Sequence, residues 1–301
     1  MPLFFERVMK VMESSGEEFE IVCVNDGSRD NTLEILKNYA DKDTRIRVID
    51  FSRNFGKESA LTAALDYSHG DAVIPIDADL QDPPELILKM IAKWREGYEV
   101  VLAKRADRSS DSFLKRVTAV LFYKFHNIIS QPHIPENVGD FRLMDRKVVD
   151  ALGGLKETHR FMKGLFAWAG FKTFTIDYTR DSRAGGSTKF NGIKLWKFAL
   201  EGITSFSTAP LTMWLYVGTF TAFIAFLYGL YIFIRTLIFG IETPGYASLV
   251  CLILFLGGLQ LIGIGILGEY LGRTYIESKR RPVYIVREVY EYKYENKGAN
   301  V

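Results

Sequence analysis

Two stretches without a charged side chain, residues 211–234 and 246–268, most constrain what this chain can fold into. Each is longer than the ~20 residues that a helix needs to cross a hydrocarbon core ~30 Å thick. Buried core helices are the alternative, but hiding two such stretches would take a very large soluble core. The sequence therefore predicts two transmembrane helices within residues 210–272.

The charges around these spans predict their orientation. The short segment 235–245 holds one Arg and one Glu, whereas 273–281 carries four basic residues. Because basic residues favour the cytoplasmic side, both ends of the hairpin are expected in the cytoplasm, with 273–301 as a C-terminal tail. Residues 1–15 mix charged and apolar side chains, which indicates an amphipathic helix and not a cleavable signal peptide. Cys23 and Cys251 are expected to be reduced thiols.

The region before the spans alternates short β-rich and helical patterns, which predicts an α/β domain with a mostly parallel sheet over residues 1–190. A length of 301 residues allows this, and a net charge of +2 excludes no class of partner. The expected strands are 19–24, 46–51, 72–76 and 99–103, and the expected helices are 32–40, 57–67 and 85–96. Ligands of such folds bind beyond the carboxyl ends of the strands.

Two acidic turns follow predicted strands. Asp77 and Asp79 stand one residue apart after an apolar run, and Asn25-Asp26-Gly27-Ser28 follows the first strand. Mg²⁺ or Mn²⁺ prefers oxygen ligands and shares its shell with substrate phosphates, so one or two carboxylates suffice. The alternative is a solvated turn that caps the helix after Pro83. Two such turns at one expected crevice favour a metal and diphosphate site.

Two further segments, 113–129 and 193–206, have one apolar stripe with aromatic and basic residues beside it. Helices of this kind can lie in a membrane interface or pack in an ordinary core, and periodicity alone does not separate the two. The second segment runs directly into Pro210 and the first span. An interface helix is therefore predicted over 191–209.

Several motifs together resemble family 2 glycosyltransferases. More narrowly, the chain resembles the polyprenyl-phosphate glycosyltransferases of the bactoprenol glucosyltransferase type, relatives of dolichol-phosphate mannose synthase. The motifs are VNDGS at 24–28, DNT at 30–32, NFGK at 54–57, DADLQDPPE at 77–85, GDFRLMD at 139–145 and GEYLGR at 268–273. The resemblance implies a nucleotide-sugar-binding domain of the GT-A type.

The resemblance also implies roles for the two acidic turns. Asp26 would bind the nucleoside of a nucleotide sugar, with Lys57 also at the donor. Asp77 would lie near the ribose and diphosphate, and Asp77, Asp79 and Gln81 would hold Mg²⁺ or Mn²⁺. For Asp26 an Asx turn on its own backbone, with the next glycine supplying the unusual dihedral angles, is an equally compatible structural role.

Basic residues complete the implied site. Arg183 and Lys189, in a loop that contains two glycines, would close over the donor diphosphate, unless this loop is only solvated surface. Arg142 and Arg160 would contact the lipid phosphate, although either can instead pair with a nearby acid. Asp140 stands where the family places its proposed base.

The implied reaction is an inverting, metal-dependent transfer of a hexose from a nucleotide diphosphate sugar to polyprenyl phosphate, with undecaprenyl phosphate as the expected acceptor. UDP-glucose is the leading donor, while N-acetylhexosamine, galactose, mannose and amino-arabinose donors stay open. The expected location is the inner membrane, as a multi-pass protein with a cytoplasmic catalytic domain. A homo-oligomer such as a tetramer is expected, and nucleic acid is not an expected partner.

The sequence departs from the family pattern at its start. The family opens with a strand that ends in a Pro-x-Tyr-Asn-Glu type motif, whereas this chain begins with the following helix, so a start placed too far downstream is expected. A nonenzymatic, membrane-tethered nucleotide-sugar-binding protein is therefore an alternative. A processive polysaccharide synthase is less favoured because the Gln-x-x-Arg-Trp motif and further spans are missing from the sequence. A transport subunit has little support from an uncharged hairpin.

Overall fold

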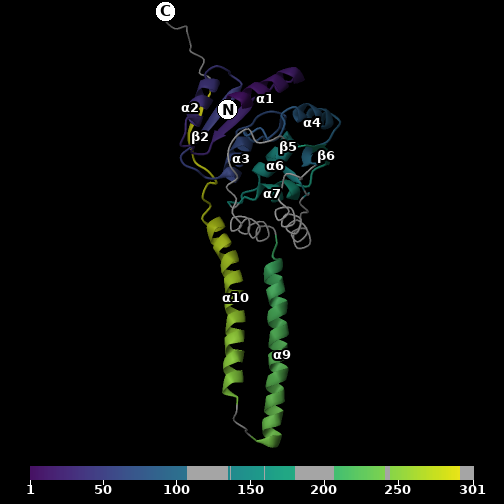
Figure 1. The fold of residues 1–301 in the computed structure, drawn as a ribbon, viewed down its shortest axis with the longest axis vertical. Coiled ribbons are helices and arrows are strands. Elements are labelled where there is room, and N and C mark those ends of the chain that lie inside the picture. The colour runs from purple at the N-terminus through teal and green to yellow at the C-terminus, as the bar shows by residue number, and fades with distance from the viewer. Residues whose placement is uncertain (107–134, 136, 159, 180–206, 241–244, 292–301) are drawn as a thin grey trace, which may run out of the picture.

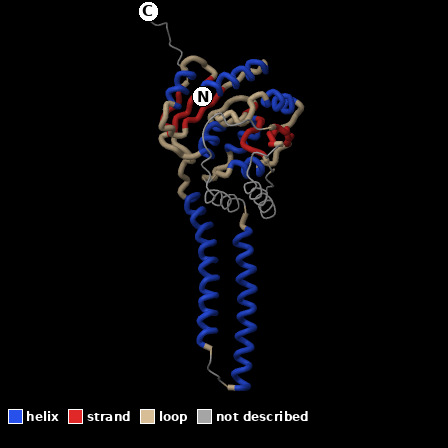
Figure 2. The backbone as a smooth tube through the Cα atoms, viewed as in Figure 1, coloured by secondary structure: helices blue, strands red, loops and turns tan. Residues whose placement is uncertain are grey.

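The computed structural model describes residues 1–106, 135, 137–158, 160–179, 207–240 and 245–291. It contains an α/β domain from which two long helices extend side by side, α9 (Ala209–Phe239) and α10 (Tyr246–Ser278) (Figure 1). In Figure 2 the strands form two separate groups within the α/β domain. The predicted segments 113–129 and 191–206 lie outside the described residues.

The first sheet has three strands in the order β1-β2-β7. β1 (Ile21–Asn25) and β2 (Ile46–Phe51) are parallel, and β7 (Val286–Tyr290) is antiparallel to β2. Helices α1 (Pro2–Ser15) and α2 (Thr32–Ala40) cover one face with a core of Phe4, Phe5, Val8 and Leu36. Helix α3 (Lys57–Asp66) packs through Ala63 against Ile49 and Phe51.

The second sheet has four strands in the order β3-β5-β4-β6. β5 pairs antiparallel with both neighbours, and β4 and β6 are parallel. Buried apolar side chains from both faces of this sheet form the rest of the core. The strands are β3 (Ala72–Val73), β4 (Val100–Arg105), β5 (Val138–Asp145) and β6 (Thr173–Tyr178), and the helices are α4 (Leu86–Arg95), α6 (Arg146–Gly153) and α7 (Met162–Trp168).

The α/β class predicted from the sequence is confirmed. The sheets differ from the expected mostly parallel arrangement in being mixed, since three of the five strand pairings are antiparallel. One cause is β5, which inserts between β3 and β4 in the opposite direction. The other is β7, which returns to the sheet from beyond the long helices.

Helices α9 and α10 carry apolar surfaces that the described part of the chain leaves exposed. By length and composition, α9 and residues Phe255–Ser278 of α10 are candidate membrane spans, and their most apolar windows are 0% and 6% buried. At about 1.5 Å per residue, the 31 residues of α9 extend about 46 Å, more than a hydrocarbon core requires. The indole of Trp214 lies on the backbone of Gly263, in the space that a Cβ at this position would need. The two helices therefore contact each other directly.

The segment after α10 is tied into the α/β domain. The Glu277 carboxylate accepts from the Thr158 backbone N–H at 3.0 Å, and the Tyr284 hydroxyl donates to Asp66 at 2.8 Å. The Tyr284 ring also stacks on Phe51. Residues 273–301 were expected to be a C-terminal tail, but residues 286–290 within this range form a strand of the first sheet.

Candidate functional site

A lysine bridges two acidic strand ends at the centre of the candidate site. Lys57, the first residue of α3, places its Nζ 2.8 Å from Asp77 Oδ2 and 2.8 Å from Asp140 Oδ2. Burial opposes the charge on Lys57, but the attraction of Asp140 and Asp77 outweighs it and raises the pKa of the ammonium group. Burial likewise opposes ionisation of Asp140, yet Lys57 lowers the pKa of that carboxyl. Lys57 and Asp140 are therefore both charged at neutral pH.

The loop that delivers Lys57 is held by Asp26. Asp26 Oδ1 accepts from the Phe55 N–H at 2.6 Å, and Oδ2 accepts from the Gly56 N–H at 2.9 Å. The Asn54 side-chain amide donates to the Asp26 carbonyl at 2.8 Å. In place of the alternative Asx turn on its own backbone, the Asp26 side chain contacts a loop about thirty residues further along the chain. Asp26 thereby fixes the start of α3, whether or not it also touches a nucleoside.

Gly27 makes this close approach possible. Its φ is +63°, a left-handed conformation that strains residues with a Cβ. A Cβ at this position would lie 2.6 Å from Asn54 N and 2.8 Å from the Arg53 carbonyl carbon. Only glycine therefore lets the turn after β1 meet the loop before α3.

The Asp77–Asp79 turn is rigid. Asp79 Oδ1 accepts from the Gln81 N–H at 3.1 Å, and Leu80 has a φ of +57° although it carries a side chain. Leu80 is 4% exposed and packs in the cluster with α1 and α2, so burial stabilises the unusual dihedral angle. The turn therefore presents Asp77 and Asp79 as a preformed pair.

The oxygen atoms near the Asp77–Asp79 turn can hold a hard cation such as Mg²⁺ only if substrate oxygens complete its coordination shell. Among the residues that the structure describes, no three His, Cys, Asp or Glu side chains form a group that could hold a metal ion. The Asp77 and Asp79 carboxylates, with the amide oxygen of Gln81, form the candidate set. Mg²⁺ is commonly held by one or two carboxylates together with substrate phosphates, so this set is compatible with such an ion.

Arg142 lies two residues from Asp140 on β5 but is not free at the surface. It is 6% exposed, its guanidinium lies 4.0 Å from the centre of the Phe166 ring, and one terminal nitrogen donates to the Gly139 carbonyl at 2.7 Å. Its Nε has no hydrogen-bond partner among the described residues. Burial lowers the pKa of Arg142 to about 10, against the opposing effect of Asp140.

The remaining predicted residues are less closely tied to this network. Arg160 donates to the backbone carbonyls of Leu155 and Glu157, at the loop before α7. Arg183 and Lys189 lie outside the described residues. The structure thus brings Asp26, Lys57, Asp77 and Asp140 into one network, with Asp79 and Gln81 in the adjoining turn.

The sequence interpretation missed two acids near the site, the half-buried Glu58 and the buried Asp82. Glu58 follows Lys57 and accepts from the Met162 N–H at 3.0 Å, and burial raises the pKa of its carboxyl. Asp82, 5% exposed, accepts from the Tyr178 hydroxyl, and burial together with this contact raises the pKa of Tyr178 to about 12. Asp82 lies inside the acidic motif at 77–85, so the sequence could have indicated it as a site residue. Its contact with Tyr178 on β6 could not be predicted from the sequence.

The chain is similar in sequence to known glycosyl transferases. Residues 4–153 match the family model described as Glycosyl transferase family 2. The chain is 55% identical over 289 residues to a prophage bactoprenol glucosyl transferase homolog of Escherichia coli strain K12, covering 96% of this chain and 94% of the relative. It is 56% identical over 287 residues to the bactoprenol glucosyl transferase of Shigella phage SfV, covering 95% and 94%. An SfII prophage-derived bactoprenol glucosyl transferase of Shigella flexneri is 56% identical over 288 residues, covering 96% and 93%.

Proposed function

Because this chain belongs to glycosyl transferase family 2, we propose that it transfers glucose from UDP-glucose to a polyprenyl phosphate, with undecaprenyl phosphate as the acceptor. The observation that carries the proposal is the charged network of Lys57, Asp77 and Asp140 beside Asp79, in a chain similar over nearly its full length to bactoprenol glucosyl transferases. The product would be a polyprenyl-phosphate sugar for modification of cell-surface glycans.

The reaction is an inverting displacement at the anomeric carbon. The bond from that carbon to the donor phosphate oxygen breaks, a bond to the acceptor phosphate oxygen forms on the opposite face, and the nucleoside diphosphate leaves. Asp77, Asp79 and Gln81 would hold Mg²⁺ or Mn²⁺, which when bound neutralises charge on the leaving diphosphate. Lys57 adds a fixed positive charge at the same place.

Asp140 has a positioning role in this proposal. A phosphate monoester has a second pKa of about 6, so the acceptor is already mostly ionised at pH 7 and needs no strong base. Lys57 keeps Asp140 ionised, which makes it a poor proton donor and a good electrostatic partner. In this proposal Asp140 orients Lys57 and repels an acceptor phosphate that binds in the wrong place. Proton transfer by Asp140 is a minor role.

The two long helices explain how the acceptor is reached. A polyprenyl chain leaves the bilayer only at a cost of ~0.8 kcal/mol per exposed CH₂, so the enzyme must bring its site to the membrane surface. Helices α9 and α10 would span the inner membrane and leave the α/β domain on the cytoplasmic side. The Glu277–Thr158 and Tyr284–Asp66 contacts would hold that domain close to the bilayer.

Further contacts are proposed for the remaining basic residues. Arg183 and Lys189 would close over the donor diphosphate, and Arg142 and Arg160 would contact the lipid phosphate. Arg142 would bind the acceptor through its Nε, which has no hydrogen-bond partner in the described part of the chain. A homo-oligomer is proposed through the glycines of α10 whose surroundings are open, such as Gly257 and Gly265.

A donor panel tests the proposal. The purified chain is incubated with undecaprenyl phosphate, Mg²⁺ or Mn²⁺, and UDP-glucose, UDP-N-acetylglucosamine, UDP-galactose or GDP-mannose, each with and without a chelator. Chelator-sensitive formation of a lipid-linked sugar from UDP-glucose is the expected result. Tight binding of a nucleotide sugar without turnover would instead identify a nonenzymatic binding protein.

A further inference from the structure

Strand β7, which follows the two long helices, brings a positive charge to a buried carboxylate of the first sheet. Asp50, near the carboxyl end of β2, is 1% exposed. Its Oδ1 accepts from the Asn25 side-chain amide at 2.7 Å, and its Oδ2 lies 3.4 Å from a terminal nitrogen of Arg287. A buried carboxylate without a cation is costly, so Arg287 stabilises Asp50 in this position.

An irregularity in the strand pairing aims Arg287 at this carboxylate. Phe51 of β2 pairs with Val286 of β7. The next pair is Asp50 with Glu288, which leaves Arg287 as an extra residue on β7 between the two pairs. An extra residue of this kind redirects a side chain. The Arg287 guanidinium consequently reaches Asp50 from the neighbouring strand.

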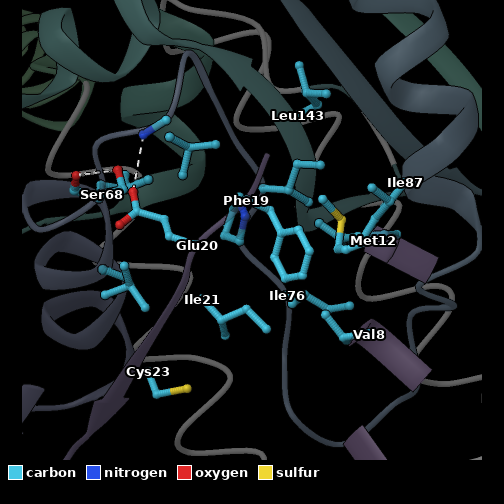
Figure 3. Close-up of a pocket in the computed structure, with 18 of the residues that line it drawn as sticks. Val8, Met12, Phe19, Glu20, Ile21, Cys23, Ser68, Ile76, Ile87 and Leu143 are labelled. Carbon is cyan, nitrogen blue, oxygen red and sulfur yellow. Dashed lines mark hydrogen bonds between the residues drawn. The ribbon is translucent and has the colours of Figure 1, made fainter. Parts of the chain in front are cut away.

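Asn25 and Asp50 lie on one face of the first sheet, because they are directly opposite each other in the parallel β1–β2 register. Asn25 shares its face of β1 with Ile21 and Cys23, since successive side chains of a strand alternate between the faces. In the pocket drawn in Figure 3, Ile21 and Cys23 lie across from Val8 of α1, and all three belong to the cluster formed with α1 and α2. The two helices therefore cover the face on which Asn25 and Asp50 meet.

Asn25 also opens the turn that contains Asp26. Its Oδ1 accepts from the Ser28 N–H at 3.3 Å, which closes the turn 25–28. The Asp26 carboxylate within that turn accepts two backbone N–H groups of the loop that delivers Lys57. A series of contacts thus connects β7 to both turns of the candidate site.

Arg287 holds the same loop directly where it leaves β2. A terminal nitrogen of Arg287 donates to the Ser52 carbonyl at 2.7 Å, and the Ser52 N–H donates to the Ile285 carbonyl at 3.0 Å. Both backbone groups of Ser52, the first residue after β2, are therefore bonded to β7 or to the residue before it. Lys57 stands at the other end of this loop, so the segment around Arg287 anchors the loop at its start.

We propose that Arg287 is a positioning residue of the donor site, which holds the turn 25–28 through Asp50 and the loop before Lys57 through Ser52. This inference rests on the proposed function, since it takes the turn and the loop as donor contacts. It adds to that function a part of the donor site that lies beyond the two long helices in the sequence. Arg287 acts through other residues, so its loss weakens donor binding and leaves the transfer step and acceptor binding unchanged.

Glucose transfer by the full chain in detergent, with donor and acceptor varied separately, tests this role. Arg287→Met should raise the KM for UDP-glucose about fivefold, a modest effect because the Arg287 side chain is 59% exposed and screened by solvent. The kcat and the KM for undecaprenyl phosphate should stay at the parent values. Arg45→Met is the matched control, because Arg45 also pairs with an aspartate, Asp43 at 2.7 Å, but before the amino end of β2. It should leave all three constants unchanged.

A double variant separates the charge of Arg287 from its packing. Arg287→Met leaves Asp50 as a buried carboxylate without its cation, whereas adding Asp50→Asn removes that charge and keeps an oxygen that can accept from Asn25. The double variant should therefore have a donor KM closer to the parent value than Arg287→Met alone. Loss of packing predicts no such rescue. Arg287→Lys, which keeps the charge, should also lie between Arg287→Met and the parent.

Hydrogen exchange distinguishes failure of this inference from failure of the proposed function. The Ser28, Phe55 and Gly56 amides are bonded to the turn 25–28, so in Arg287→Met they should exchange about fivefold faster. The amides of β4 and β5 in the second sheet are the internal reference and should not change.

Four results would overturn the positioning role: unchanged exchange of the three amides, an unchanged donor KM in Arg287→Met, an equal rise of the donor KM in Arg45→Met, or no rescue in the double variant. If the parent chain transfers no sugar while the three amides exchange faster in Arg287→Met, the proposed function fails and the role of Arg287 in holding the turn and the loop is supported.

Discussion

Replacing Lys57 by methionine is expected to raise the pKa of the Asp140 carboxyl. The Lys57 ammonium group lies 2.8 Å from Asp140 and lowers the pKa of that carboxyl, so its removal lets the pKa rise. An opposite charge within hydrogen-bond reach typically lowers a carboxyl pKa by about 1–3 units. Since the Lys57 side chain is 54% exposed and screened by solvent, the lower end, about 1 unit, is expected.

The assay is a carbon NMR titration of the Asp140 side-chain carboxyl in the parent chain and in Lys57→Met, which reports this group directly. A pKa shift of about 1 unit moves the midpoint of the titration to higher pH by the same amount. Lys147→Met is the matched control, because Lys147 is also 54% exposed and pairs with Glu99 at 2.7 Å, away from the candidate site. An Asp140 titration midpoint that stays in place in Lys57→Met, or moves equally in both variants, would refute the coupling between Lys57 and Asp140.

Three further predictions concern Gly27, Asp79 and Glu58. In denaturant titrations, Gly27→Ala should lower the free energy of unfolding by at least about 2 kcal/mol more than Gly97→Ala does. Both glycines have a positive φ, but only at Gly27 would a Cβ collide with backbone atoms. Asp79→Asn should abolish chelator-sensitive transfer while membrane insertion is retained, whereas the exposed Asp41→Asn should leave the rate unchanged; full activity of Asp79→Asn would remove the metal assignment. Burial raises the pKa of Glu58, so this carboxyl costs stability once the pH rises above its unfolded value. Glu58→Gln should therefore have a higher free energy of unfolding than the parent chain at about pH 7 and the same free energy near pH 3. A difference between variant and parent that is the same at both pH values would contradict this explanation.

The local sequence patterns predicted the features that depend on short-range periodicity. The uncharged stretches at 211–234 and 246–268 correspond to α9 and α10, but both helices continue into charged residues because a helix need not end where the hydrocarbon would. Strands β1, β2 and β4 were also anticipated. In each of these cases hydrophobic runs bounded by turn residues carry the signal.

Features that depend on distant partners could not be predicted. β7, with the sequence VREVY, reads as part of a polar tail, and only its pairing with β2 makes it a strand. β5 gives no sign of its antiparallel direction, because periodicity does not encode the orientation of a strand. At the site, Asp26 was expected to bind a nucleoside, with an Asx turn as its structural alternative, but its partners Phe55 and Gly56 become neighbours only after the fold has formed.

The most direct test of the proposed activity is transfer of labelled glucose from UDP-glucose into an organic-extractable lipid in vesicles that contain undecaprenyl phosphate, Mn²⁺ and the purified chain. The proposal predicts that label appears in the lipid with the parent chain, disappears with a chelator, and is absent with Asp79→Asn. A folded, membrane-inserted parent chain that leaves all label in the aqueous phase, whatever the metal, would contradict it.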